Sequence, residues 1–187
     1  MMKRILFAAT LGLAACSGDA PIRYAAPDPA PAERVRVPYG SILVREVSLP
    51  SHAASEEIAI AGASGELTGN AASLWADEPV RAVTLGLARA LTEITGARVA
   101  PEPWPFESYP DVAVDVRIEE MLPMDDGTYR VRGMAFVAPA GDKGRDRARS
   151  FELSVPYDQA SGYSAIAAAR SALIAQLAMM VVRQGMR

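Results

Sequence analysis

The chain has 187 residues, of which 50% are hydrophobic, 6% aromatic and 22% charged, and its formal net charge is −3. This composition is typical of a globular domain and excludes a disordered chain. The negative charge argues against nucleic acid as the main partner, because phosphate binding needs a basic surface. A single cysteine and a single histidine exclude an internal disulfide and a Cys/His zinc site.

The amino terminus has the layout of a secretory signal: a basic start at Lys3 and Arg4, then an apolar run over residues 5–13. A membrane-spanning helix is the alternative, but it needs about 20 apolar residues and this run is roughly half as long. The end of the run resembles the lipobox of bacterial lipoproteins, which comprises Leu13, Ala14 and Ala15 before Cys16. We therefore predict a lipoprotein signal peptide over residues 1–15.

This resemblance implies acylation of Cys16 by a diacylglyceryl group and an amide-linked chain such as palmitate, which together anchor a protein durably. Ser17 follows in place of the aspartate that retains some lipoproteins in the inner membrane. The sequence thus favours the periplasmic face of the outer membrane.

Residues 16–38 are rich in alanine and proline, a composition that favours an extended tether. Residues 22–24 could instead dock as a short edge strand, and the sequence leaves both options open. We expect residues 39–187 to form one periplasmic domain, which begins with a strand over residues 41–49 that Pro50 ends. Two short strands over residues 57–61 and 66–68 could follow.

The next segment changes to helical spacing, and the pattern predicts a helix over residues 79–96. Pro79 suits its first turn and Gly96 its end, while Asp77 and Glu78 suit the positive helix terminus. Its apolar positions are Val80, Val83, Leu87, Leu91 and Ile94.

Alternating apolar residues predict strands over residues 112–118, 128–138 and 150–155, joined as an antiparallel meander by short connections. A last helix should run over residues 163–184. Arg170 and Gln176 interrupt its apolar surface, which favours a packed helix over a membrane span. The expected fold is therefore α+β, with a mostly antiparallel sheet and two long helices packed on one face.

The order of these segments resembles the PqiC/YmbA family of ABC-type transport auxiliary lipoproteins. Three stretches carry most of the resemblance: residues 43–50 with their Leu-Pro end, residues 74–79 with Trp75 and Pro79, and the alanine-rich residues 163–173. Trp104 ahead of Tyr109 fits the family's tryptophan before the first meander strand. The resemblance covers nearly the whole chain after the signal peptide.

The resemblance implies an outer-membrane component of an MCE-type lipid transport system, which acts by docking and assembly and not as an enzyme. Its expected partners are an MCE-domain protein, the outer membrane and further copies of itself, and no cofactor is implied. The alternative is a periplasmic adaptor or activator lipoprotein for another envelope machine, such as a cell-wall synthase.

Four residues are candidates for partner contact or for a family motif: Trp75, Pro79, Trp104 and Tyr109. Tryptophan is enriched in binding hot spots, but a core role is favoured for Trp75 and is as plausible as partner contact for Trp104. We expect no catalytic or metal site. His52 beside Ser51 lacks the nucleophile elbow of a hydrolase and is expected to be a surface histidine.

Overall fold

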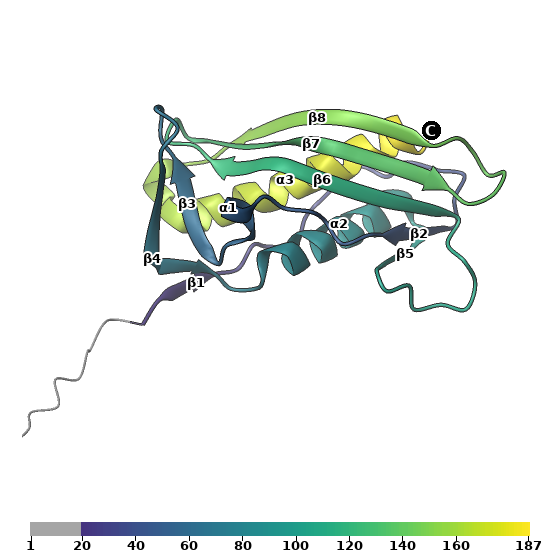
Figure 1. Ribbon diagram of the computed structural model, residues 1–187, viewed down its shortest axis with the longest axis horizontal. Coiled ribbons are helices and arrows are strands. Elements are labelled where there is room, and N and C mark those ends of the chain that lie inside the picture. Colours follow the sequence, from purple (N-terminus) through teal and green to yellow (C-terminus); the bar gives the residue numbers. More distant parts are fainter. Residues whose placement is uncertain (1–19) are drawn as a thin grey trace, which may run out of the picture.

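The computed structural model describes residues 20–187, which form an α+β fold with two sheets and three α-helices (Figure 1). The signal peptide and Cys16 lie outside the described residues. The larger sheet has the strand order β5-β2-β6-β7-β8, and the smaller sheet has the order β1-β4-β3.

The predicted meander is confirmed: β6 (Val112–Pro123), β7 (Thr128–Pro139) and β8 (Arg147–Pro156) pair antiparallel in chain order. Each strand is longer than the alternating pattern indicated. A bulge between Ile118 and Glu120 shifts the register of β6, and Gly133 lies opposite it on β7. A Cβ at Gly133 would approach the Arg117 carbonyl oxygen to 2.2 Å, so only glycine fits here.

The expectation of a mostly antiparallel sheet is met only in part, because strand orientation is mixed in both sheets. β2 (Ser41–Val44) pairs parallel with both β5 (Arg98–Pro101) and β6, and β1 (Ile22–Tyr24) pairs parallel with β4 (Leu67–Trp75). Parallel neighbours need a crossover, and here the chain passes through β3, β4 and the helix α2 between β2 and β5. Alternation within a strand shows which face is buried but not which strand lies beside it.

The first strand of the domain is shorter than the predicted 41–49 because the chain leaves the regular ladder after Val44. The Val47 N–H donates to Thr84 Oγ1 on α2 at 3.0 Å, and Ser48 then forms an isolated bridge to Arg117. The short helix α1 (Ser51–Ala54) and β3 (Glu57–Ala61) follow. β4 extends well beyond the three residues expected for it.

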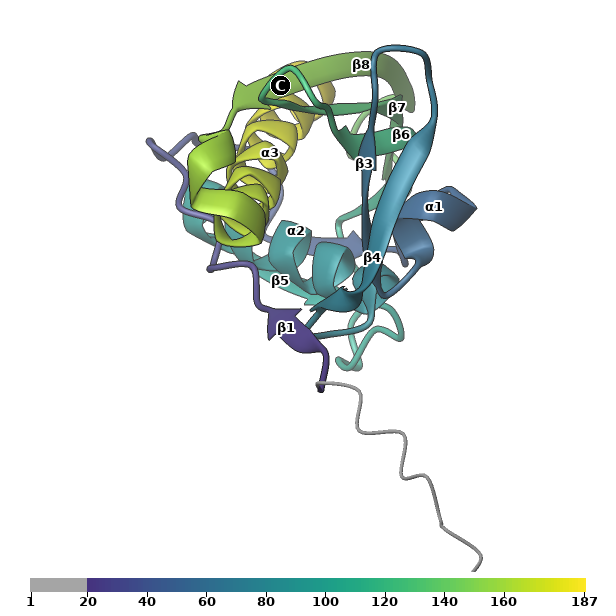
Figure 2. The same ribbon diagram turned by 90° about the vertical axis from the view of Figure 1, so that its left-hand side faces the viewer.

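Both long helices are confirmed as α2 (Pro79–Thr95) and α3 (Gly162–Gly185), which follows a short 3-10 turn at Gln159–Ser161. They pack against each other and against the larger sheet, with α3 under β7 and β8 and α2 beside β5 (Figure 2). Gly96 ends α2 in the left-handed conformation, at φ 68°. The main core lies between the helix pair and the sheet.

The helix α3 and its preceding turn are long and apolar enough to span a membrane by length and composition. However, 72% of the apolar window is buried inside the protein. A helix that is apolar on nearly all sides packs in this way when it is the central element of a core.

Residues 22–38, expected to belong to an extended tether, are extended but lie against the domain. Residues 22–24 dock as β1, which settles the option that the sequence left open. Further along, Val35 is 4% exposed and its N–H donates to the Ile94 carbonyl oxygen at 2.8 Å. Burial of apolar residues such as Val35 and Pro29 holds the segment in place.

Candidate functional site

The lipobox and Cys16 lie outside the described residues, so acylation stays a prediction. The other candidates lie in two separate regions of the structure. Trp75 and Pro79 lie where β4 meets α2, while Trp104 and Tyr109 lie in the loop between β5 and β6.

Trp75 ends β4 and is 6% exposed. It packs in a small cluster with Ile58 and Ile166, and its backbone pairs with Tyr24 of β1. This burial leaves little of the indole for a partner, in agreement with the core role favoured from the sequence.

Pro79 is the first residue of α2 and is buried. Glu78 precedes it, and its carboxylate accepts hydrogen bonds from the backbone N–H groups of Val80 at 3.0 Å and Arg81 at 2.6 Å. These bonds satisfy two of the free N–H groups at the helix start. Trp75, Glu78 and Pro79 thus fix the position of α2 relative to β4.

Residues 102–111 form the loop from β5 to β6, and aromatic side chains gather on it. Trp104 and Phe106 meet edge to face with ring centroids 4.9 Å apart, and the Arg98 guanidinium lies 4.8 Å from the Phe106 centroid. The Trp104 indole N–H donates to the Ser108 carbonyl oxygen at 2.6 Å. Phe106 is 39% exposed and Tyr109 is 92% exposed. We call Trp104, Phe106 and Tyr109 the aromatic loop.

His52 is not the surface histidine expected from the sequence. It lies on α1, half-buried, and its Nε2 is buried without a hydrogen-bond partner among residues 20–187. No group of three or more His, Cys, Asp or Glu side chains that could hold a metal ion occurs in that part of the chain.

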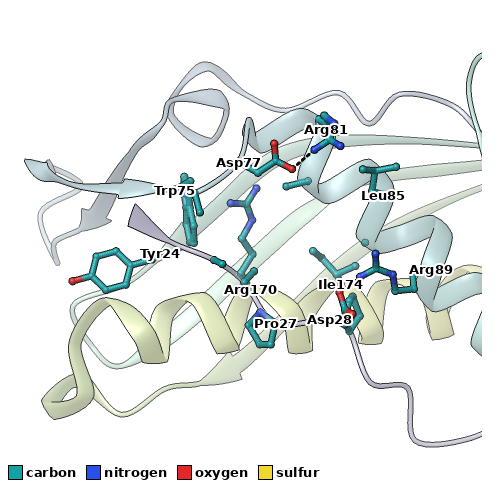
Figure 3. A pocket seen from close by; sticks show the side chains of 16 residues that line it. Tyr24, Pro27, Asp28, Trp75, Asp77, Arg81, Leu85, Arg89, Arg170 and Ile174 are labelled. Carbon is teal, nitrogen blue, oxygen red and sulfur yellow. Dashed lines mark hydrogen bonds and ion pairs between the residues drawn. The ribbon is translucent and has the colours of Figure 1, made fainter. Parts of the chain in front are cut away.

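A pocket of about 320 Å³ lies where the N-terminal segment crosses the start of α2 and the first half of α3 (Figure 3). Its walls are mostly apolar and include Tyr24, Pro27, Pro29, Trp75, Leu85 and Ile174. Three arginines and two aspartates also line it. Arg81 pairs with Asp77, and Arg89 pairs with Asp28.

The third arginine, Arg170, is buried at 3% exposure. Its Nη2 donates to the Pro79 carbonyl oxygen at 3.1 Å, and its Cζ lies 4.3 Å from the Trp75 ring centroid. In Figure 3 the side chain rises from α3 with its guanidinium between Trp75 and Asp77. Burial lowers the pKa of Arg170, while the charges of Tyr129, Glu78 and Asp77 act in the opposite direction.

In the sequence, Arg170 argues against a membrane span, and its position also carries a second signal. Arg170 is four residues after Ile166 and four before Ile174, so it shares the buried face of α3. A cation on that face must meet a polar group from elsewhere in the fold. The pocket itself could not be predicted, because its other wall comes from the N-terminal segment.

The family model for the ABC-type transport auxiliary lipoprotein component matches residues 24–182. The chain belongs to this family. It is the PqiC/YmbA type of lipoprotein that the sequence resembles.

Solved structures show that this lipoprotein shares its fold with other proteins. One is an uncharacterised protein with a TM-score of 0.72 and 18% identity, aligned over 89% of this chain and 99% of the other. Another is a protein of the family DUF330 from Xanthomonas campestris, with a TM-score of 0.61, 19% identity and coverage of 87% and 91%. Among curated proteins, none matches the chain.

The family match runs from Tyr24 almost to the end of α3, so it includes the pocket and the aromatic loop. As a member of a transport auxiliary lipoprotein family, the protein is a component of the cell envelope.

Proposed function

We propose that this lipoprotein is the outer-membrane-anchored periplasmic component of an MCE-type lipid transport system, acting by docking and assembly. Family membership over residues 24–182 is the observation that carries the proposal. The predicted acylation of Cys16 would hold the domain at the outer membrane, in reach of a partner that crosses the periplasm.

The two ends of the molecule suit an adaptor. β1, which follows the predicted lipid anchor at Cys16 in the chain, lies toward one end of the long axis. The loop between β5 and β6 lies near the other end (Figure 1). The aromatic loop lies far from the anchored end and exposes Phe106 and Tyr109. Exposed aromatic groups beside a cation such as Arg98 are typical of protein-binding hot spots.

Assembly into a homo-oligomer is part of the proposal, and the edge of β4 supports it. Residues 67–72 are all exposed. On the side away from β3, β4 pairs with β1 only at Ser73, Leu74 and Trp75. The rest of that edge offers unpaired backbone groups to a neighbouring copy.

The docking role is tested by capturing partners in cells with the tagged protein and a cross-linker. We expect an MCE-domain protein to be captured, and Trp104→Ala to lower its yield by at least about tenfold. The melting temperature should change by less than about 2 °C, because the loop lies outside the main core. Ile22→Ala is the matched control, since it removes another exposed apolar side chain that lies in neither the aromatic loop nor the open edge of β4.

Two results would refute this function. Capture of a cell-wall synthase in place of an MCE-domain protein would favour the alternative adaptor role. Equal capture by Trp104→Ala and wild type would remove the aromatic loop as the docking site.

A further inference from the structure

The guanidinium of Arg170 is a buried cation without a carboxylate of its own. No ion pair within residues 20–187 involves it. A guanidinium carries five N–H donors, and a buried cation is costly unless it is paired and hydrogen-bonded. The hydrogen bond to Pro79 and the contact with Trp75 satisfy only part of this group.

The acids near Arg170 are already engaged by other groups. Asp77 forms its ion pair with Arg81, and Glu78 accepts the two N–H bonds that begin α2. Both carboxylates are on exposed residues, whereas Arg170 lies in the interior. Their fields stabilise the cation from a distance but leave its other donors available.

The pocket around Arg170 combines this cation with apolar walls. Its three arginines outnumber its two aspartates, although the whole chain is acidic. The ion pairs of Arg81 and Arg89 are at least half exposed on the arginine side, so they are weak and can rearrange around a ligand. A volume of about 320 Å³ is in the range of small-molecule sites.

We propose that this pocket binds the phosphate group of an anionic amphiphile, with Arg170 in direct contact with the phosphate. Guanidinium and phosphate form bidentate, charge-assisted hydrogen bonds. The apolar part of the ligand would lie along Pro27, Leu85 and Ile174. The ligand source is either a phospholipid of the membrane or a free phosphate ester.

The position of the pocket favours the phospholipid. The pocket begins at Tyr24, the last residue of β1, and the chain from Cys16 to Ile22 spans at most about 20 Å when fully extended. Only this preference for a phospholipid rests on the proposed function, because it assumes that acylated Cys16 anchors the chain in the membrane. The charge and the shape of the pocket do not depend on it.

Binding can be measured on the purified domain by tryptophan fluorescence. The chain has two tryptophans, so a Trp104→Phe background leaves Trp75 in the pocket wall as the sole emitter. The probes are dihexanoyl phosphatidylglycerol, dihexanoyl phosphatidylcholine and glycerol phosphate. We expect saturable binding of phosphatidylglycerol, at least about tenfold tighter than that of the zwitterionic lipid.

Arg170→Gln should weaken phosphatidylglycerol binding by at least about tenfold. Arg183→Gln is the matched control, because it removes an exposed arginine from the same helix at its other end. It should leave binding unchanged. Arg170→Lys keeps the positive charge but loses the planar guanidinium that can donate two parallel hydrogen bonds. We therefore expect an intermediate affinity for phosphatidylglycerol. If Arg170→Gln fails to fold, the lysine variant and the contrast between the two lipids decide the question.

Glycerol phosphate that binds as tightly as phosphatidylglycerol would support a phosphate site supplied by a soluble ester and would refute the phospholipid source. Equal binding of the two lipids, no binding of any probe, or unchanged binding by folded Arg170→Gln would overturn the proposal. Because no partner is present, these outcomes are independent of MCE-domain capture.

Discussion

Asp111 joins three segments that lie far apart in the sequence. Its Oδ2 accepts hydrogen bonds from the N–H groups of Gly40 at 2.7 Å and Ser41 at 3.1 Å, and its other oxygen pairs with Lys143. The Ser41 hydroxyl in turn accepts from the Asp111 N–H at 3.0 Å. The hydrogen bond from Lys143, with those from Gly40 and Ser41, lowers the pKa of Asp111 below its ordinary value of 3.8, against the effect of burial.

We predict that Asp111→Asn lowers the free energy of unfolding at pH 7 by roughly 1–2 kcal/mol, because it replaces a charged acceptor by a neutral one. A carboxyl group with a depressed folded-state pKa stabilises the protein above its unfolded pKa, and this contribution disappears as the pH falls through the folded value. The difference between wild type and variant should therefore shrink from pH 5 to about pH 2.

Urea unfolding followed by circular dichroism measures this difference. Asp142→Asn, which changes an exposed acid in the loop between β7 and β8, is the control and should change stability little at any pH. A difference between wild type and Asp111→Asn that stays constant down to about pH 2 would show that the charge of Asp111 contributes nothing.

The strand β4 combines a buried end with an exposed edge. Its final residues pair with β1 and bury Trp75, but residues 67–72 are exposed and open on one side. Long open edges are sites of pairing between chains, and native proteins commonly block them when no partner exists. This edge therefore fits the proposed homo-oligomer.

Asn70→Pro should convert the oligomer to a monomer, because proline removes an N–H donor from the edge and cannot continue a ladder. Asn70 has no paired residue in the register between β3 and β4, so the fold should tolerate the change. Light scattering after size exclusion measures the mass, and Asn70→Ala is the matched control. A wild-type monomer, or an unchanged oligomer in Asn70→Pro, would exclude this interface.

Elements with strong local periodicity could be predicted from the sequence. The alternation in β6 located the start of that strand, although the strand continues to Pro123. The 3.6-residue spacing located α2, and Pro79 and Gly96 marked the helix ends. β5 and α1, with four residues each, carry too few positions for any period. The parallel pairings were missed because they depend on contacts between distant segments.

The candidate site could be predicted only in part for the same reason. The aromatic residues of the loop stand out among few aromatics, and the structure indeed exposes Phe106 and Tyr109 there. The pocket needs Pro27, Trp75 and Arg170 from three distant segments. A local pattern cannot show that they meet.

The molecule as a whole has two different ends, as the proposed adaptor role requires. One end carries β1, and the loop between β5 and β6 lies toward the other (Figure 1). Family membership and the predicted acylation of Cys16 together suggest how these ends are oriented. In the proposed arrangement β1 would lie on the side of the membrane, and the loop would face the periplasm.

The anchor is tested most directly by separating the inner and outer membranes of cells that express the wild type or Cys16→Ala. Our account predicts that the wild type sediments with the outer membrane and that Cys16→Ala does not. Wild-type protein in the soluble periplasmic fraction, or in the inner membrane, would contradict it.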